Sequence, residues 1–182
     1  MEMKTTREEI FNALEHLELA KSAALQLMHG VPAERSAQKP ADGGWSAIQV
    51  YQHILFSEFG TLGYMQKKTS SGTEALDKIS EQEQAAGQKL VDRLKSNERY
   101  AAPAILPEPD GNESLEAIEL RWKHLRAELD TFVKGLDEGF YDRLVFKQPA
   151  AGMISLMDTL KFLTEHIHHH IPQLARLRGH HE

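Results

Sequence analysis

The chain contains no cysteine among its 182 residues. This absence excludes disulfide bonds, zinc sites with thiolate ligands and catalysis by a cysteine nucleophile. A metal ion bound by this chain would therefore need nitrogen and oxygen ligands. If the chemistry involves sulfur, the thiol must arrive with a substrate.

The sequence also lacks a long apolar run, a surplus of basic residues and an apolar signal core at its start. A membrane-spanning helix needs roughly 18 consecutive apolar residues, and nucleic-acid-binding proteins usually carry excess positive charge. This chain instead has a net charge of -6. We therefore expect a cytoplasmic protein that binds neither a membrane nor nucleic acid. Its length fits one helical-bundle domain over residues 1–182.

Amphipathic segments separated by turn signals predict an all-α protein. Capping signals and a 3.6-residue apolar period place long helices from Thr6 to about Gly30, Ser46 to about Lys68, Leu115 to about Gly135, and from Ser155 onward. A weaker helical segment, Thr73 to about Lys95, is diluted by Gly87 and many polar residues. Tyr141 to Gly152 is expected to be a loop with some extended character. The pattern predicts a four-helix bundle with an additional peripheral helical segment in the middle of the chain.

Four histidines fall within five positions of the last predicted helix: His166, His168, His169 and His170. Rotation by about 100° per residue places His170 about 40° and His166 about 80° from the middle of the inward apolar stripe. His168 and His169 lie further round, toward solvent or a partner. The inward pair is spaced i, i+4, so both side chains can reach one metal ion. The alternative, in which these are hydrogen-bonded core histidines, stays open from spacing alone.

A third ligand would complete an open metal site. His53, which follows Trp45-Ser46 at the start of the second predicted helix, is the leading candidate. It lies nearly opposite the strongest apolar stripe of that helix, among partly small residues. Periodicity does not decide whether His53 is a ligand, a core residue or a surface residue.

Two segments resemble the signatures of the DinB-like superfamily, of the DinB_2 type. The first is Asp42-Gly43-Gly44-Trp45-Ser46 with Gln49, Val50, His53, Ile54 and Glu58, and the second is Phe162, His166, His169, His170, Gln173 and Leu174. The resemblance covers the second and last predicted helices, and elsewhere only the helical character agrees. It implies a four-helix bundle in which His53, His166 and His170 bind one divalent metal ion, zinc or nickel first among the candidates.

Other positions in these signatures are expected to have different roles. His169 matches a family histidine that is not a ligand. Glu58 lies about 140° around its helix from His53, so we interpret it as a structural or interface residue. Ile171-Pro172 departs from the Arg-Gly often found before the glutamine, so no substrate-contacting basic group is inferred there.

The resemblance also implies a range of functions, since the superfamily includes bacillithiol transferases and YfiT-like putative metal-dependent hydrolases. Our first hypothesis is metal-dependent S-transfer from a low-molecular-weight thiol to an electrophilic small molecule. The alternatives are hydrolysis by metal-activated water and a non-catalytic, stress-related bundle that binds a small molecule. No general base is identifiable by spacing, so the hydrolase hypothesis rests on the metal alone.

Two further expectations concern the fold and its assembly. A ferritin-like di-iron protein is rejected, since it needs two Glu-x-x-His motifs, and this chain has one match, Glu165 with His168, which points away from the inward stripe. The second helix is apolar on more faces than one bundle contact requires, which predicts a buried subunit interface and a homodimer.

Overall fold

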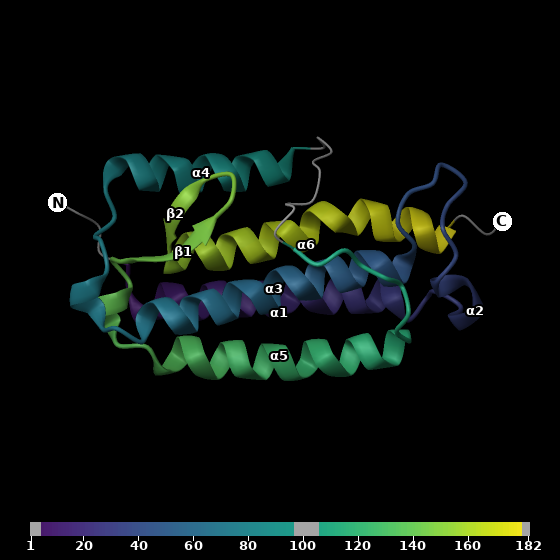
Figure 1. Ribbon diagram of the computed structural model, residues 1–182, viewed down its shortest axis with the longest axis horizontal. Coiled ribbons are helices and arrows are strands. Elements are labelled where there is room, and N and C mark those ends of the chain that lie inside the picture. The colour runs from purple at the N-terminus through teal and green to yellow at the C-terminus, as the bar shows by residue number, and fades with distance from the viewer. Residues whose placement is uncertain (1–4, 97–105, 180–182) are drawn as a thin grey trace.

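The computed structural model describes residues 5–96 and 106–179. Four long helices lie side by side as an elongated bundle (Figure 1), which confirms the predicted all-α fold. They are α1 (Arg7–Met28), α3 (Ala47–Thr69), α5 (Leu115–Gly135) and α6 (Leu156–Gly179). α1 packs most extensively on α6, and α3 contacts both α5 and α6. A single short turn of helix, α2 (Ala33–Ser36), lies between α1 and α3.

The first two long helices begin at the predicted capping residues. Thr6 Oγ1 accepts a hydrogen bond from the Glu9 backbone N–H at 3.2 Å, and the Glu9 carboxylate accepts one from the Thr6 N–H at 2.8 Å. Ser46 and Gln49 form the equivalent pair at 3.3 and 3.1 Å. Each capping box satisfies backbone N–H groups that a helix start otherwise leaves without partners. Local sequence therefore sets where α3 begins, and with it the position of His53.

The weak middle segment, expected to be a peripheral helix from Thr73 to about Lys95, is broken into two pieces. It consists of a 3-10 turn, η1 (Thr73–Ala75), followed by α4 (Glu81–Lys95), which runs along one side of the bundle in Figure 1. α4 packs on α6 and on the strand β2. A Cβ atom at Gly87 would lie 2.6 Å from the Asp158 carboxyl carbon, so glycine permits this close approach of the two helices.

The segment Tyr141 to Gly152, expected to be a loop with some extended character, contains a regular strand, so the loop prediction holds for only part of it. After the 3-10 turn η2 (Glu138–Phe140), β1 (Leu144–Gln148) pairs antiparallel with β2 (Gly152–Ser155). Three of the five β1 residues in a row are buried, so the strand lacks the polar–apolar alternation that marks a half-buried strand. The hairpin lies between α4 and the bundle, where β1 contacts α3 and β2 contacts α4.

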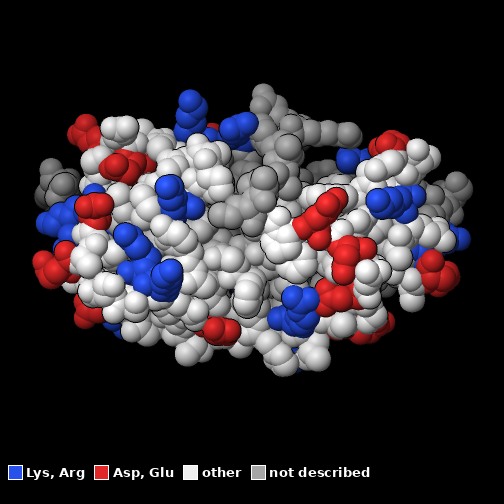
Figure 2. Space-filling model, in the orientation of Figure 1, with Lys and Arg blue, Asp and Glu red and all other residues white. Residues whose placement is uncertain are grey.

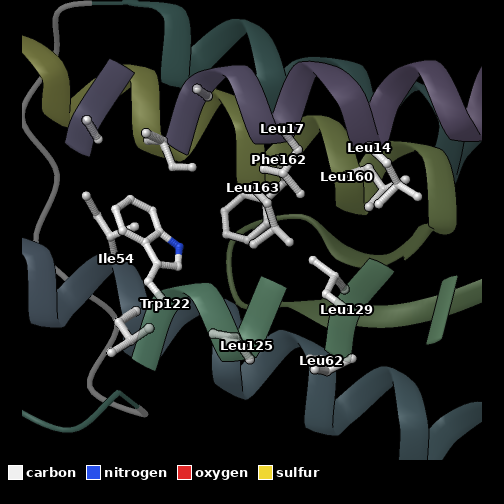
Figure 3. Close-up of a cluster of buried hydrophobic side chains, with 14 of the residues drawn as sticks. Leu14, Leu17, Ile54, Leu62, Trp122, Leu125, Leu129, Leu160, Phe162 and Leu163 are labelled. Atoms are coloured by element: carbon white, nitrogen blue, oxygen red, sulfur yellow. The ribbon is translucent and has the colours of Figure 1, made fainter. Parts of the chain in front are cut away.

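The core fills the space between the four long helices. Figure 3 shows Trp122 and Leu125 of α5 projecting toward Leu17 of α1 and Leu163 of α6. Trp122, Leu17 and Leu163 are all fully buried. Within residues 5–96 and 106–179, none of the helices combines the length and apolar character that crossing a membrane requires.

One buried ion pair fastens α3 to α5 inside this core. Glu58 Oε1 lies 2.7 Å from Arg126 Nη2, and Glu58 Oε2 accepts hydrogen bonds from Arg126 Nε at 3.0 Å and Trp122 Nε1 at 2.9 Å. Both charged side chains are more than nine-tenths buried. Glu58, interpreted from the sequence as a structural or interface residue, thus makes structural contacts within the chain.

We predict that Glu58→Gln lowers the free energy of unfolding by about 3–5 kcal/mol, because the Arg126 guanidinium would stay buried without a counter-charge. Urea unfolding measures this loss. Glu128→Gln is the matched control, since Glu128 is exposed and contacts Gln66 at 2.9 Å on the surface. It should cost less than about 1 kcal/mol. Equal losses in the two variants would contradict the role given to Glu58.

Candidate metal centre

Three histidines from two helices meet at the interior of the bundle. His53 lies two turns into α3, and His166 and His170 lie one turn apart on α6. All three are at least nine-tenths buried. The structure thus brings together the three residues that the resemblance selects, and it places the α6 pair inward as helical rotation predicts.

The imidazole rings approach each other through their Nε2 atoms. His166 Nε2 lies 3.0 Å from His53 Nε2 and 3.3 Å from His170 Nε2. The three ring planes are steeply inclined to one another, at 72° to 83°. Edges rather than faces therefore converge, and the candidate ligand nitrogens all lie within 4.8 Å of one another.

The tautomer of His170 is set by a neighbouring amide. His170 Nδ1 lies 3.0 Å from Gln173 Oε1, which can only accept a hydrogen bond. Nδ1 therefore carries the proton, and the lone pair of His170 lies on Nε2, facing the other two rings. An outer hydrogen bond of this kind is the usual way in which a protein orients a metal-ligating histidine. His53 Nδ1 and His166 Nδ1 are buried and have no hydrogen-bond partner in the described protein.

The environment favours the neutral form of each ring. Burial, with the added effect of the charge on His170, lowers the pKa of His53 to about 3. The same causes hold the pKa of His166 well below its usual range. Burial lowers the pKa of His170 to about 4, although its hydrogen bond to Gln173 acts in the opposite direction. At neutral pH all three rings therefore keep a lone pair for a ligand.

This donor set fits a small divalent cation. Two ligands at about 2.0–2.1 Å from a tetrahedral zinc ion lie about 3.3 Å apart, close to the two measured nitrogen–nitrogen distances. A proton on His166 Nε2 could form a good hydrogen bond to only one of the two neighbouring Nε2 atoms. A cation, in contrast, would be bound by the lone pairs of all three Nε2 atoms. Three neutral imidazoles and no carboxylate suit zinc, nickel or copper better than calcium or magnesium.

Comparison with known families agrees with this geometry. The family model described as DinB superfamily matches residues 16–174, which include all three histidines and nearly all of the bundle. The chain belongs to the DinB superfamily. Neither the curated proteins nor the solved structures include a match to it.

His168 and His169, the other two histidines of the cluster in this DinB-superfamily chain, have different surroundings. His168 is half exposed and lies 3.5 Å from the Glu165 carboxylate, as expected for an outward residue. His169, expected to lie toward solvent or a partner, is instead partly buried against α4 of the same chain. Its Nδ1 lies 3.1 Å from the Leu94 carbonyl oxygen at the end of α4, and its ring contacts that of His170. Rotation alone could not show this, since α4 covers a flank of α6 that the bundle leaves open.

A large cavity of about 830 Å³ opens onto the three histidines. Its walls come from α3, α4, α6 and the β-hairpin, and they are mainly apolar. Six aromatic side chains contribute to the lining: Trp45, Phe56, Phe59, Tyr64, Phe146 and Phe162. Such a mainly apolar cavity with a few polar groups at one end is the usual form of a small-molecule site.

Part of this aromatic wall leads directly to the candidate ligands. Phe162 stacks on His166 with ring centroids 5.7 Å apart, and Phe146 stacks on Phe162 at 6.1 Å. The ring centroid of Trp45 lies 4.9 Å from that of His53. No sequence pattern linked Phe146 to the site, because it belongs to a hairpin that was expected to be a loop with some extended character.

In the sequence, Gln173 and Trp45 match positions of the family signatures, but no role could be assigned to either residue. The structure places Gln173 against a candidate ligand and Trp45 at the edge of the cavity. The i, i+3 spacing of Gln173 from His170 is the signal that could have identified it, since such residues are neighbours on a helix.

We predict that the metal-free protein loses stability as the pH falls from about 6.5 to 4. The folded pKa values of His53 and His170 lie below the ordinary value of about 6.5, so in this window the unfolded chain binds protons that the folded chain does not. Each such histidine removes up to about 1.4 kcal/mol per pH unit. Above about pH 7 these groups are neutral in both states and contribute no slope.

Urea unfolding at a series of pH values, with a chelator present, measures the slope. His170→Gln removes one of the titrating groups and should flatten it, while His168→Gln serves as the matched control on the exposed flank. If the unfolding free energy depends on pH equally in His170→Gln and His168→Gln, the assignment of the pH dependence to His170 is wrong.

Proposed function

We propose that His53, His166 and His170 bind one divalent metal ion, zinc or nickel, and that the protein uses it for S-transfer from a low-molecular-weight thiol to an electrophilic small molecule. The observation that carries the proposal is the convergence of three buried Nε2 atoms at the floor of an apolar cavity. Three protein ligands leave a coordination position for a substrate atom.

A bound metal ion would favour the thiolate form of a coordinated thiol, which is the reactive nucleophile. The protein supports this chemistry by holding three neutral nitrogen donors and by surrounding them with apolar walls. Those walls limit the access of water, which otherwise competes for the open position. Because the chain has no cysteine, the thiol must be a cosubstrate.

Hydrolysis is the second function implied by membership of the family. A hydrolase normally needs a general base near the attacking water. Among the described residues, neither aspartate nor glutamate lines the cavity, and the buried Glu58 is held by Arg126. This favours thiol transfer, in which the nucleophile is already ionised. Screening of esters, amides and lactones without thiol separates the two functions.

We expect the purified protein to bind one zinc or nickel ion per chain. His166→Ala should remove one of three ligands and weaken the affinity by at least about 100-fold, measured by competition with a chromogenic chelator. His168→Ala is the matched control, since it removes an exposed neighbouring imidazole. Equal affinity in both variants, or no binding by the wild type, would contradict the metal site.

We expect the metal-loaded protein to consume thiol when a model electrophile such as monobromobimane is added. The rate should depend on the metal, fall to the uncatalysed level in His166→Ala and stay near the wild-type level in His168→Ala. A panel of bacillithiol, mycothiol and glutathione tests the thiol. If His166→Ala is as fast as the wild type, the transferase function is wrong.

The expected homodimer and cytoplasmic location stay predictions. Packing within the chain already accounts for most of the apolar character of α3, because α5, α6 and β1 each cover part of it. Phe59, with 66% of its surface exposed at the cavity, is the main apolar side chain of α3 left uncovered.

A further inference from the structure

Two buried polar side chains of the cavity keep hydrogen-bonding groups that the described protein does not use. They are Gln148, at the end of β1, and Ser57 of α3. Each is only 6% exposed. Hydrogen-bonding groups that face an apolar cavity and that the protein itself does not use are available to a bound molecule, so they indicate where a ligand forms hydrogen bonds.

The orientation of the Gln148 amide is fixed by the hairpin turn. Its Oε1 accepts hydrogen bonds from the backbone N–H groups of Ala150 at 2.6 Å and Ala151 at 2.9 Å. Since both partners are donors, the carbonyl end of the amide must face them. The Nε2 group therefore has two N–H donors, and neither has an acceptor within residues 5–96 and 106–179. Only an acceptor can pair with it.

Ser57 departs from the behaviour of the other buried hydroxyls on the long helices. Thr61 and Thr69 of α3, like Thr159 and Thr164 of α6, each donate to the carbonyl oxygen four residues earlier. Ser57 makes no such bond, and its hydroxyl has no other partner in the part of the chain described. It lies one turn after His53, so it is on the same face of α3 and close to the three histidines.

The charges around the cavity agree with an acceptor. Lys147, adjacent to Gln148, lines it, whereas no described aspartate or glutamate does. Elsewhere the surface is mixed, and Figure 2 shows acidic and basic side chains interspersed over the face that it displays.

We propose that Gln148 and Ser57 donate hydrogen bonds to a substrate oxygen, so that the cavity takes an aromatic or otherwise apolar molecule bearing a carbonyl or carboxylate group. This inference rests on the proposed function only in taking this cavity as the substrate site. The aromatic wall receives the apolar part of the molecule, and the two donors orient its oxygen. Both residues are positioning residues for the substrate.

Gln148→Glu tests the proposal with little change in shape. The carboxylate keeps an oxygen for the Ala150 and Ala151 N–H groups, so the turn is retained, while the donor group is replaced by an acceptor. Isothermal titration calorimetry on metal-free protein compares four probes of similar size: benzylacetone, hydrocinnamate, butylbenzene and phenylpropylamine. Gln84→Glu adds the same charge at an exposed position of α4 and is the matched control.

The expected result is a selective change. Gln148→Glu should lose about 3- to 10-fold in affinity for benzylacetone and more for hydrocinnamate, keep its affinity for butylbenzene and gain affinity for phenylpropylamine. Gln84→Glu should bind all four probes as the wild type does. A wild-type preference for benzylacetone assigns the site to carbonyl groups, and a preference for hydrocinnamate assigns it to carboxylates. The proposal is overturned if all probes change together, if none changes, or if the wild type binds none.

Ser57→Ala provides a second test that does not depend on the hairpin. It should lower the affinity for benzylacetone by about 3- to 10-fold relative to butylbenzene, whereas Thr69→Val, which removes a buried hydroxyl of α3 outside the cavity, should not. If Gln148→Glu does not fold, this comparison decides the question. Since no metal or thiol is present in these titrations, failure of the transferase function would leave their outcome unaffected.

Discussion

The rotational setting of α3 is the constraint on which the candidate site depends. Glu58 binds Arg126 and Trp122 of α5 from one face of α3, and His53 projects from another face about 140° away. A charged pair inside the core tolerates little rotation, because turning α3 would separate the carboxylate from both donors. The contact with α5 therefore holds His53 toward α6. Trp122, which donates to Glu58, also belongs to the buried apolar cluster shown in Figure 3.

Local sequence was enough to predict where the first two long helices begin. Thr6 and Ser46 begin α1 and α3 through hydrogen bonds within four residues of chain, and these bonds do not depend on the rest of the fold. Periodicity was also enough for His166 and His170, because α6 has one dominant apolar stripe. It left the role of His53 undecided, since α3 is buried on several faces by α5, α6 and β1, and the pattern of a helix buried all round does not rank its faces.

The features that sequence reasoning missed all depend on contacts between distant segments. The β-hairpin has a buried β1 because α3 covers it, and that contact removes the alternation by which strands are recognised. In the sequence, Gly87 weakens the helical pattern of its segment. In the structure, it marks the point where α4 approaches Asp158. His169 contacts Leu94 across 75 positions of chain. The donor group of Gln148 is identified only once the turn beyond it is known.

The separation of the candidate ligands along the chain has a consequence for folding. His53 and His166 are 113 positions apart, while His166 and His170 share one helical turn. The α6 pair can thus form as soon as its helix does, but the third nitrogen arrives only when a loop of more than a hundred residues has closed. Such long-range closure is a slow step compared with helix formation. An ion captured early by α6 would meet α3 later and would then act as a cross-link between the two halves of the chain, in the manner of a disulfide in a protein that has no cysteine to form one.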